Sequence, residues 1–162
     1  MKQKNPSLLI CDSLKIFVSI RQRKLLTICK MMRILLVDDE SDVCFVLENV
    51  LIEYGYVVDS YEHPLVALDN FKPNLYNLVI LDIRMPDLNG FALCREIKKL
   101  DKKVKICFLT AGELTPYYGV YSDIFSSITA NCVIRKPIEN EELMKRINEI
   151  IYDTIDDGLK NL

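Results

Sequence analysis

The chain has 162 residues, of which 50% are hydrophobic and 27% charged, a balance typical of a folded domain rather than a disordered chain. This length gives room for one domain with a full core and short extensions. Residues 1–32 carry a net charge of +6 and the remainder −8. The acidic body argues against direct contact with nucleic acid. No apolar run is long enough to predict a transmembrane segment.

The cysteines and the single histidine do not indicate a zinc site. No two cysteines form a CxxC pair, and His63 stands beside Pro64 in a predicted loop. Four of the six cysteines fall inside the apolar pattern of predicted elements, which favours reduced core residues in a cytoplasmic protein. The six are Cys11, Cys29, Cys44, Cys94, Cys107 and Cys132.

The basic segment 1–32 leaves three interpretations open. The first is a poorly ordered or upstream-translated extension, in which case Met31 or Met32 is the natural start. The second is a basic amphipathic helix that lies on a membrane or a partner. The third is a signal peptide. Arg21 interrupts the apolar stripe that the second interpretation needs. The third needs a clean apolar stretch and a small-residue cleavage site, and the segment has neither.

From Arg33 onward, short apolar runs alternate with helical periodicity. The predicted strands are 34–37, 57–61, 78–81, 105–109 and 132–134, and helices are predicted from Ser41 to Gly55, over 64–71, from Gly90 and from about Asn140. The strand at 57–61 is the most polar, which suits a sheet edge. This order predicts one parallel sheet with helices on both faces.

Two apolar stripes are predicted to pack on this sheet. In the first helix the stripe consists of Val43, Val46, Leu47, Val50, Leu51 and Tyr54. In the segment between Thr110 and Lys136 it consists of Tyr117, Tyr121, Ile124 and Ile128. The leftover Tyr118 and the length of that segment favour a second interpretation, in which this surface is also a signalling face.

Polar residues follow the apolar runs where each predicted strand ends. Asp38 and Asp39 follow the first, Asp82 the third, Thr110 the fourth and Lys136 the fifth. Since sites in parallel sheets form beyond the carboxyl ends of the strands, we expect these side chains to meet. Three carboxylates, a hydroxyl and an ammonium can hold a divalent cation and move a phosphoryl group onto a carboxylate.

With these motifs in place, the chain resembles a response-regulator receiver domain of two-component signalling. The resemblance covers residues 33–151, leaves 152–162 as a short tail, and rests on Val37-Asp38-Asp39-Glu40, Leu81 to Gly90, Leu109-Thr110-Ala111 and Arg135-Lys136-Pro137. It implies a flavodoxin-like (βα)5 fold, a doubly wound parallel sheet with strand order 2-1-3-4-5.

The resemblance also implies a role for each site residue. Asp82 would be the nucleophile that becomes phosphorylated, and Mg²⁺ would be bound by Asp38, Asp39, Asp82 and the backbone carbonyl of Arg84. Lys136 would pair with the phosphoryl group.

Three further residues complete the implied site. Thr110 would donate its hydroxyl to a phosphoryl oxygen, small Ala111 would line the phosphoryl site, and the peptide bond before Pro137 would be cis. The protein would not be an enzyme, except that it would catalyse its own aspartyl phosphorylation and dephosphorylation.

The chain departs from the family at one position and varies at two others. Val133 stands where receivers carry a Tyr or Phe that moves inward on phosphorylation, which puts that coupling in question. Arg84 and Gly112 occupy places that tune dephosphorylation in the family.

The implied function is a stand-alone phosphoacceptor in the cytoplasm. A histidine kinase would phosphorylate Asp82, and the face of the fourth helix, fifth strand and fifth helix (α4-β5-α5 in the family) would bind downstream target proteins or form a weak homodimer. One alternative is a receiver-like interaction module that is not phosphorylated. Another is a Mg²⁺-dependent phosphohydrolase of the haloacid-dehalogenase type, which needs an Asp where Arg84 stands.

Overall fold

The computed structural model describes residues 32–127 and 132–152. Its elements are β1 (Arg33–Val37), α2 (Ser41–Glu53), β2 (Val57–Tyr61), α3 (Pro64–Asn70), β3 (Leu78–Asp82), α4 (Gly90–Leu100), β4 (Lys105–Thr110), η1 (Thr115–Tyr117), α5 (Ser122–Ser127), β5 (Val133–Arg135) and α6 (Asn140–Tyr152). The interpretations of the basic segment and of the tail concern residues outside the described ranges, apart from Met32 and Tyr152.

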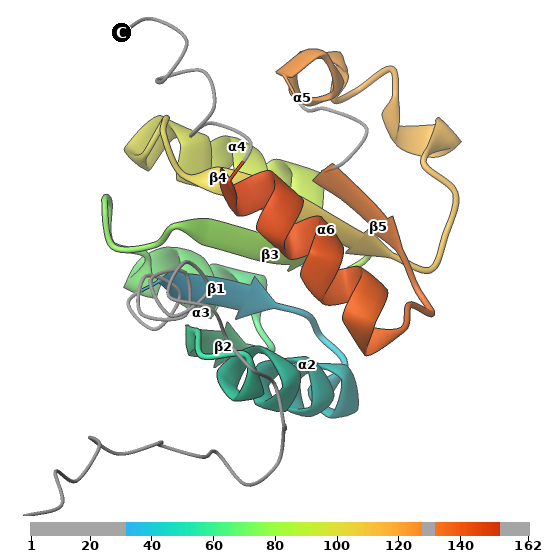
Figure 1. Cartoon of the computed structure of the whole chain (residues 1–162). Coiled ribbons are helices and arrows are strands. Elements are labelled where there is room, and N and C mark those ends of the chain that lie inside the picture. Colours follow the sequence, from blue (N-terminus) through green and yellow to red (C-terminus); the bar gives the residue numbers. More distant parts are fainter. Residues whose placement is uncertain (1–31, 128–131, 153–162) are drawn as a thin grey trace, which may run out of the picture.

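The five strands form one parallel sheet in the order β2-β1-β3-β4-β5. This confirms the predicted fold and places the polar strand β2 at an edge. Helices α2 and α6 cover one face, and α3 and α4 cover the other (Figure 1). The chain order reverses between β1 and β3, which is where such sheets place their sites.

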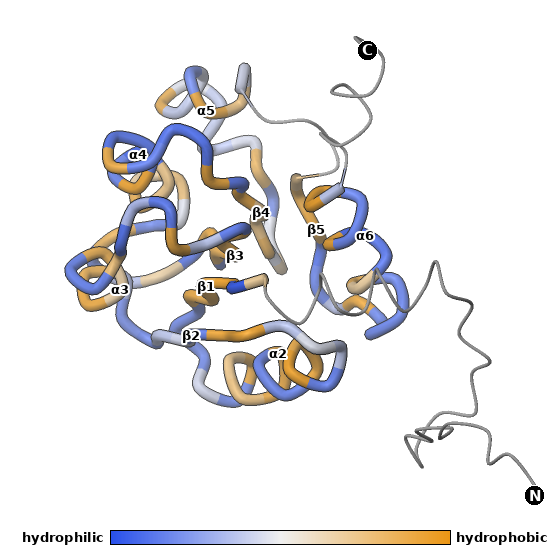
Figure 2. Tube along the Cα trace, turned by 60° about the vertical axis from the view of Figure 1, so that its left-hand side comes forward, coloured by the Kyte–Doolittle hydropathy of each residue, from blue (hydrophilic) through white to orange (hydrophobic). Residues whose placement is uncertain are grey.

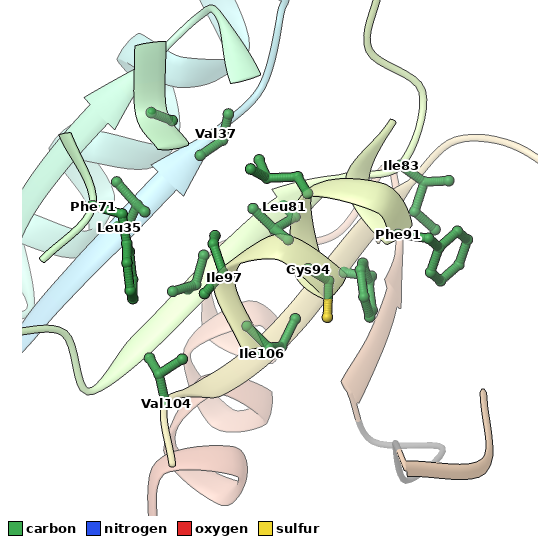
Figure 3. Close-up of a cluster of buried hydrophobic side chains, with 14 of the residues drawn as sticks. Leu35, Val37, Phe71, Leu81, Ile83, Phe91, Cys94, Ile97, Val104 and Ile106 are labelled. Atoms are coloured by element: carbon green, nitrogen blue, oxygen red, sulfur yellow. The ribbon is translucent and has the colours of Figure 1, made fainter. Parts of the chain in front are cut away.

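The core lies in two layers, one on each side of the sheet. Figure 2 shows the hydrophobic positions of the strands and helices turned toward this interior, with hydrophilic positions outside. On the α3 and α4 side, Cys94 and Ile97 of α4 face Leu81 of β3 and Ile106 of β4 (Figure 3). Because β1 and β3 are buried on both faces, they form near-continuous apolar runs.

Helix α2 buries a narrower stripe than its periodicity predicts. Cys44, Val50 and Leu51 are buried, whereas Val46 is 53% and Tyr54 42% exposed. The helix lies against β1 and the edge strand β2, where the sheet is too narrow to cover a broad apolar face. The predicted end of the helix is confirmed, since Gly55 follows it with a φ of 93°.

The segment between β4 and β5 forms a 3-10 turn (η1) and the short helix α5. Tyr117 and Tyr121 pack against the core, and Ile124 is buried, as the predicted stripe requires. Ile128 lies outside the described residues. Tyr118 is 51% exposed. Strand β5 begins at Val133, one residue later than predicted.

Candidate functional site

The predicted site residues meet at the carboxyl ends of the strands. Asp38 follows β1, Asp82 ends β3 and Thr110 ends β4, and all three are buried. Lys136 follows β5 and reaches the same place. The parallel topology therefore brings together residues that are up to 98 positions apart in the chain.

The Lys136 ammonium joins two buried carboxylates. Its Nζ lies 2.5 Å from Oδ2 of Asp38 and 2.8 Å from Oδ1 of Asp82. Glu40 is a more distant partner, with its Oε1 3.9 Å from the same nitrogen. Sequence reasoning gave Glu40 no role, although it directly follows the Asp38-Asp39 pair.

The other oxygen of each carboxylate accepts a backbone N–H. Glu40 N donates to Oδ1 of Asp38 at 3.1 Å, and Arg84 N donates to Oδ2 of Asp82 at 2.6 Å. Both bonds come from the loop that directly follows the strand. The loops therefore hold the two carboxylates in fixed orientations.

Burial and the ion pairs act in opposite directions on these charges. Burial raises the pKa of the Asp38 carboxyl, and the hydrogen bond from Lys136 lowers it only in part. For Lys136, burial opposes the charged form, but hydrogen bonds to Asp38 and Asp82 outweigh it and raise the pKa. Lys136 therefore stays a cation at neutral pH.

The remaining predicted residues surround this pair. Asp39 and Ala111, which directly follow Asp38 and Thr110 in the chain, are exposed. Thr110 Oγ1 accepts a hydrogen bond from Gly112 N at 3.0 Å, and the Lys136 N–H donates to the Thr110 carbonyl at 2.8 Å. The peptide bond between Lys136 and Pro137 is cis.

Arg84 and Gly112 are in direct contact. A Cβ on Gly112 would lie 3.0 Å from Cζ of Arg84 and 3.1 Å from Nη1. The guanidinium therefore rests on the turn that follows Thr110, and a side chain at Gly112 would have to displace it. The sequence singled out both residues but gave no sign that they touch.

Helix α4 begins directly behind the phosphoacceptor candidate. A Cβ on Gly90 would lie 2.2 Å from the Asp82 carbonyl oxygen, so no larger residue fits without a shift. Asn89 caps the helix through a bond from Ala92 N to its Oδ1 at 3.0 Å. Its Nδ2 donates to the Tyr121 hydroxyl at 2.9 Å, a contact that no spacing rule predicts.

The donors at this edge fit a hard divalent cation by their chemistry. Asp38, Asp39, Asp82 and the Arg84 carbonyl offer only oxygen atoms, which Mg²⁺ prefers. Within residues 32–127 and 132–152, no three His, Cys, Asp or Glu side chains already form a chelating cluster. Lys136 instead neutralises Asp38 and Asp82, so a cation would have to share these oxygens with the ammonium.

The sequence profile of the response regulator receiver domain matches residues 34–148. The chain belongs to the response regulator receiver family. Among curated relatives, the probable transcriptional regulator ycf27 of Porphyridium aerugineum is 36% identical over 124 residues, which are 74% of this chain and 48% of that protein. The chain spans about half the length of the curated relatives it matches.

Solved receiver domains share the fold. The non-phosphorylated HemR receiver domain of Leptospira biflexa is 34% identical, with a TM-score of 0.63 over 74% of this chain and 94% of that one. The response regulator TrrA of Thermotoga maritima, in complex with Mg²⁺ and BeF, is 35% identical, with a TM-score of 0.59 over 74% and 99%. Receiver domains are not conventional enzymes; they work with histidine kinases and downstream effectors.

In the described part of the chain, no helix combines the length and apolar character needed to cross a membrane.

Proposed function

We propose that this receiver is a phosphoacceptor that takes a phosphoryl group on Asp82 and thereby changes its contacts with other proteins. The observation that carries this proposal is the position of Asp82, buried at the end of β3 and held between the Lys136 ammonium and the Arg84 N–H. The donor would be the phosphohistidine of a histidine kinase or a small acyl phosphate.

The chemistry would use side chains of this site together with an external phosphoryl donor and the cation discussed below. An Asp82 carboxylate oxygen attacks phosphorus, the bond from phosphorus to the donor nitrogen or oxygen breaks, and the leaving group departs with its electron pair. Lys136 and the Thr110 hydroxyl would stabilise the charge that spreads over the phosphoryl oxygens. Exposed Ala111, next to Thr110, would leave space for these oxygens.

We further propose that Asp38, Asp39, Asp82 and the Arg84 carbonyl hold Mg²⁺. Three carboxylates about 5 Å apart repel one another by roughly 3 kcal/mol per pair at an effective dielectric near 20. When bound, the cation would neutralise this charge and that of the incoming phosphoryl oxygens. Lys136 performs part of this neutralisation itself, since it already contacts two of the carboxylates.

The readout would be protein–protein contact through the face formed by α5, β5 and α6, with a weak homodimer as one use of that face. This assignment follows the family resemblance and the exposure of Tyr118 beside α5. The acidic domain is not expected to contact nucleic acid directly, and we expect it to act in the cytoplasm.

The two alternatives have less support. A phosphohydrolase of the haloacid-dehalogenase type needs an acid two residues after the nucleophile, where Arg84 stands with its guanidinium on Gly112. An interaction module that is never phosphorylated would have no use for a buried Asp38–Lys136–Asp82 arrangement, in which the pKa of Asp38 is raised by burial.

Partner capture with a phosphoryl analogue tests this function. The full chain is immobilised with Mg²⁺ and with or without beryllofluoride, and retained proteins are identified by mass spectrometry. We expect partners that bind the analogue-loaded wild type and not Asp82→Ala. Identical partners in all samples would favour the unphosphorylated interaction module.

A further inference from the structure

Tyr121 joins the segment after β4 to the loop after Asp82. Its hydroxyl accepts a hydrogen bond from Nδ2 of Asn89 at 2.9 Å across 32 residues. We call this hydrogen bond the Asn89–Tyr121 link. Asn89 at the same time caps α4 through its Oδ1. Both polar ends of the Asn89 side chain are therefore engaged, and its position depends on Tyr121.

The link reaches the backbone of the phosphoacceptor. Gly90, the residue after Asn89, lies so close to the Asp82 carbonyl that even a methyl group would not fit. Gly90 N also donates to the Ile83 carbonyl at 3.0 Å. A displacement of Asn89 therefore moves atoms in contact with Asp82 and its neighbour.

The Tyr121 ring is held on its other sides by two residues of α4. Its centroid lies 5.4 Å from that of Phe91 and 4.9 Å from Cζ of Arg95. Arg95 in turn binds Asp123 of α5, with Nη2 and Oδ1 2.6 Å apart, and the Val120 carbonyl at 3.2 Å. A movement of Tyr121 is thus shared with the surface around Val120, which is 66% exposed.

The same segment is tied to the site at its beginning. Thr110 and Gly112 bond to each other, and Arg84 lies on Gly112. The segment from Gly112 to Ser127 is therefore attached to the Asp82 loop at two points, Gly112 and Tyr121. Val133, at the usual place of the moving aromatic residue, is aliphatic and packs against the core.

We propose that Tyr121 is a positioning residue that, through Asn89 and Gly90, couples phosphorylation of Asp82 to the surface of η1 and α5. This inference rests on the proposed function, because it assumes that Asp82 accepts a phosphoryl group.

Hydrogen–deuterium exchange of the full chain tests the link, with Mg²⁺ and with or without beryllofluoride. In wild type, the analogue should change exchange in residues 115–127 by roughly threefold or more. Tyr121→Phe removes only the hydroxyl, and we expect it to abolish most of that difference. Because coupling is reciprocal, it should also change the apparent beryllofluoride affinity by roughly two- to tenfold, the range of one hydrogen bond.

Two further variants separate coupling from simple loss of structure. Asn89→Ser keeps a good helix cap but is too short to reach Tyr121, so it should reproduce Tyr121→Phe, and the double variant should add nothing. Tyr118→Phe removes the hydroxyl of a nearby exposed tyrosine instead, and this variant should respond like wild type. The coupling would be overturned if Tyr121→Phe exchanged faster both with and without beryllofluoride but kept the full difference between the two in residues 115–127. A wild type that binds no beryllofluoride would overturn the proposed function itself.

Discussion

Lys136 sets the charge balance around Asp82, because its ammonium contacts Asp38 and Asp82 at once. The sequence predicted that these residues would meet, since each follows a strand of one parallel sheet. It did not predict that the second oxygen of each carboxylate would accept an N–H from the next loop. Such bonds depend on the local path of the backbone, which residue types alone do not define.

Replacing Lys136 tests this balance. Lys136→Met removes the cation and keeps a side chain of similar length, so the phosphoryl oxygens lose one charged partner. We expect phosphorylation by acetyl phosphate to slow by about tenfold or more, measured as a time course of the intact mass. Lys145→Met is the matched control, because Lys145 is exposed and pairs only at 3.8 Å with Glu142. Equal rates for Lys136→Met and wild type would contradict this role.

We predict that Arg84 prolongs the life of the aspartyl phosphate. Its guanidinium lies over the turn after Thr110, where we expect it to restrict access of water. In Arg84→Ala we expect the phosphoryl group to be lost roughly two- to tenfold faster, equivalent to about 0.4–1.4 kcal/mol in the barrier. Gly112→Ala, which would push the guanidinium aside, should act in the same direction. The decay of the +80 Da species after removal of the donor measures the lifetime, and unchanged lifetimes in both variants would remove the role.

At the scale of the elements, the observed strands agree with those predicted from the sequence more closely than the helices do. Continuous apolar runs such as Ile34 to Val37 can only be covered on both faces, so their assignment was secure. The stripe of α2 was predicted too wide, because Val46 and Tyr54 are exposed. The Asn89–Tyr121 link joins residues whose spacing follows no periodic rule, and the sequence could not reveal it.

The start of α4 depends on a residue without a side chain. Gly90→Ala would place a Cβ 2.2 Å from the Asp82 carbonyl oxygen. We expect it to lower the free energy of unfolding by about 3 kcal/mol, measured by urea denaturation. Gly119→Ala is the control, since its Cβ would meet nothing within 4 Å, and it should change stability by about 0.5 kcal/mol or less. Equal stabilities of the two variants would refute the close contact.

Asp101 ties the end of α4 to the loops before β3 and β4. Its carboxylate accepts N–H bonds from Asn74 at 2.8 Å and from Lys103 and Val104 at 2.9 and 3.2 Å. The bond from Asn74 has the largest effect, and together these bonds hold the pKa of Asp101 below its ordinary value of 3.8. Because the folded pKa is the lower one, the stabilisation is present above pH 3.8 and is lost as the pH falls through the folded pKa.

Asp101→Asn should therefore destabilise the domain at neutral pH. We expect a loss of about 1–3 kcal/mol at pH 7, since an amide cannot accept all three bonds, and a smaller loss below about pH 4. Urea denaturation across this range measures the difference, with the exposed Asp69→Asn as control. A loss that is the same at pH 3 and pH 7 would contradict the ionic origin of the effect.

At the scale of the whole molecule, the alternation of strands and helices predicted a parallel sheet with helices on both faces, and the family resemblance implied its strand order. The observed order β2-β1-β3-β4-β5 confirms both. The receiver-domain profile matches residues 34–148. The predicted domain bounds of 33–151 stay a prediction. The sequence did not identify a partner. The exposure of side chains such as Tyr118 and Val120, on which a binding surface would depend, follows from packing.

Intact-mass spectrometry after incubation with acetyl phosphate and Mg²⁺ tests the central claim most directly. The wild-type chain should gain about 80 Da, whereas Asp82→Ala should gain nothing, and removal of Mg²⁺ with a chelator should suppress the gain because the carboxylates then repel the donor. A wild-type mass that does not change, or an equal gain in Asp82→Ala, would contradict the account.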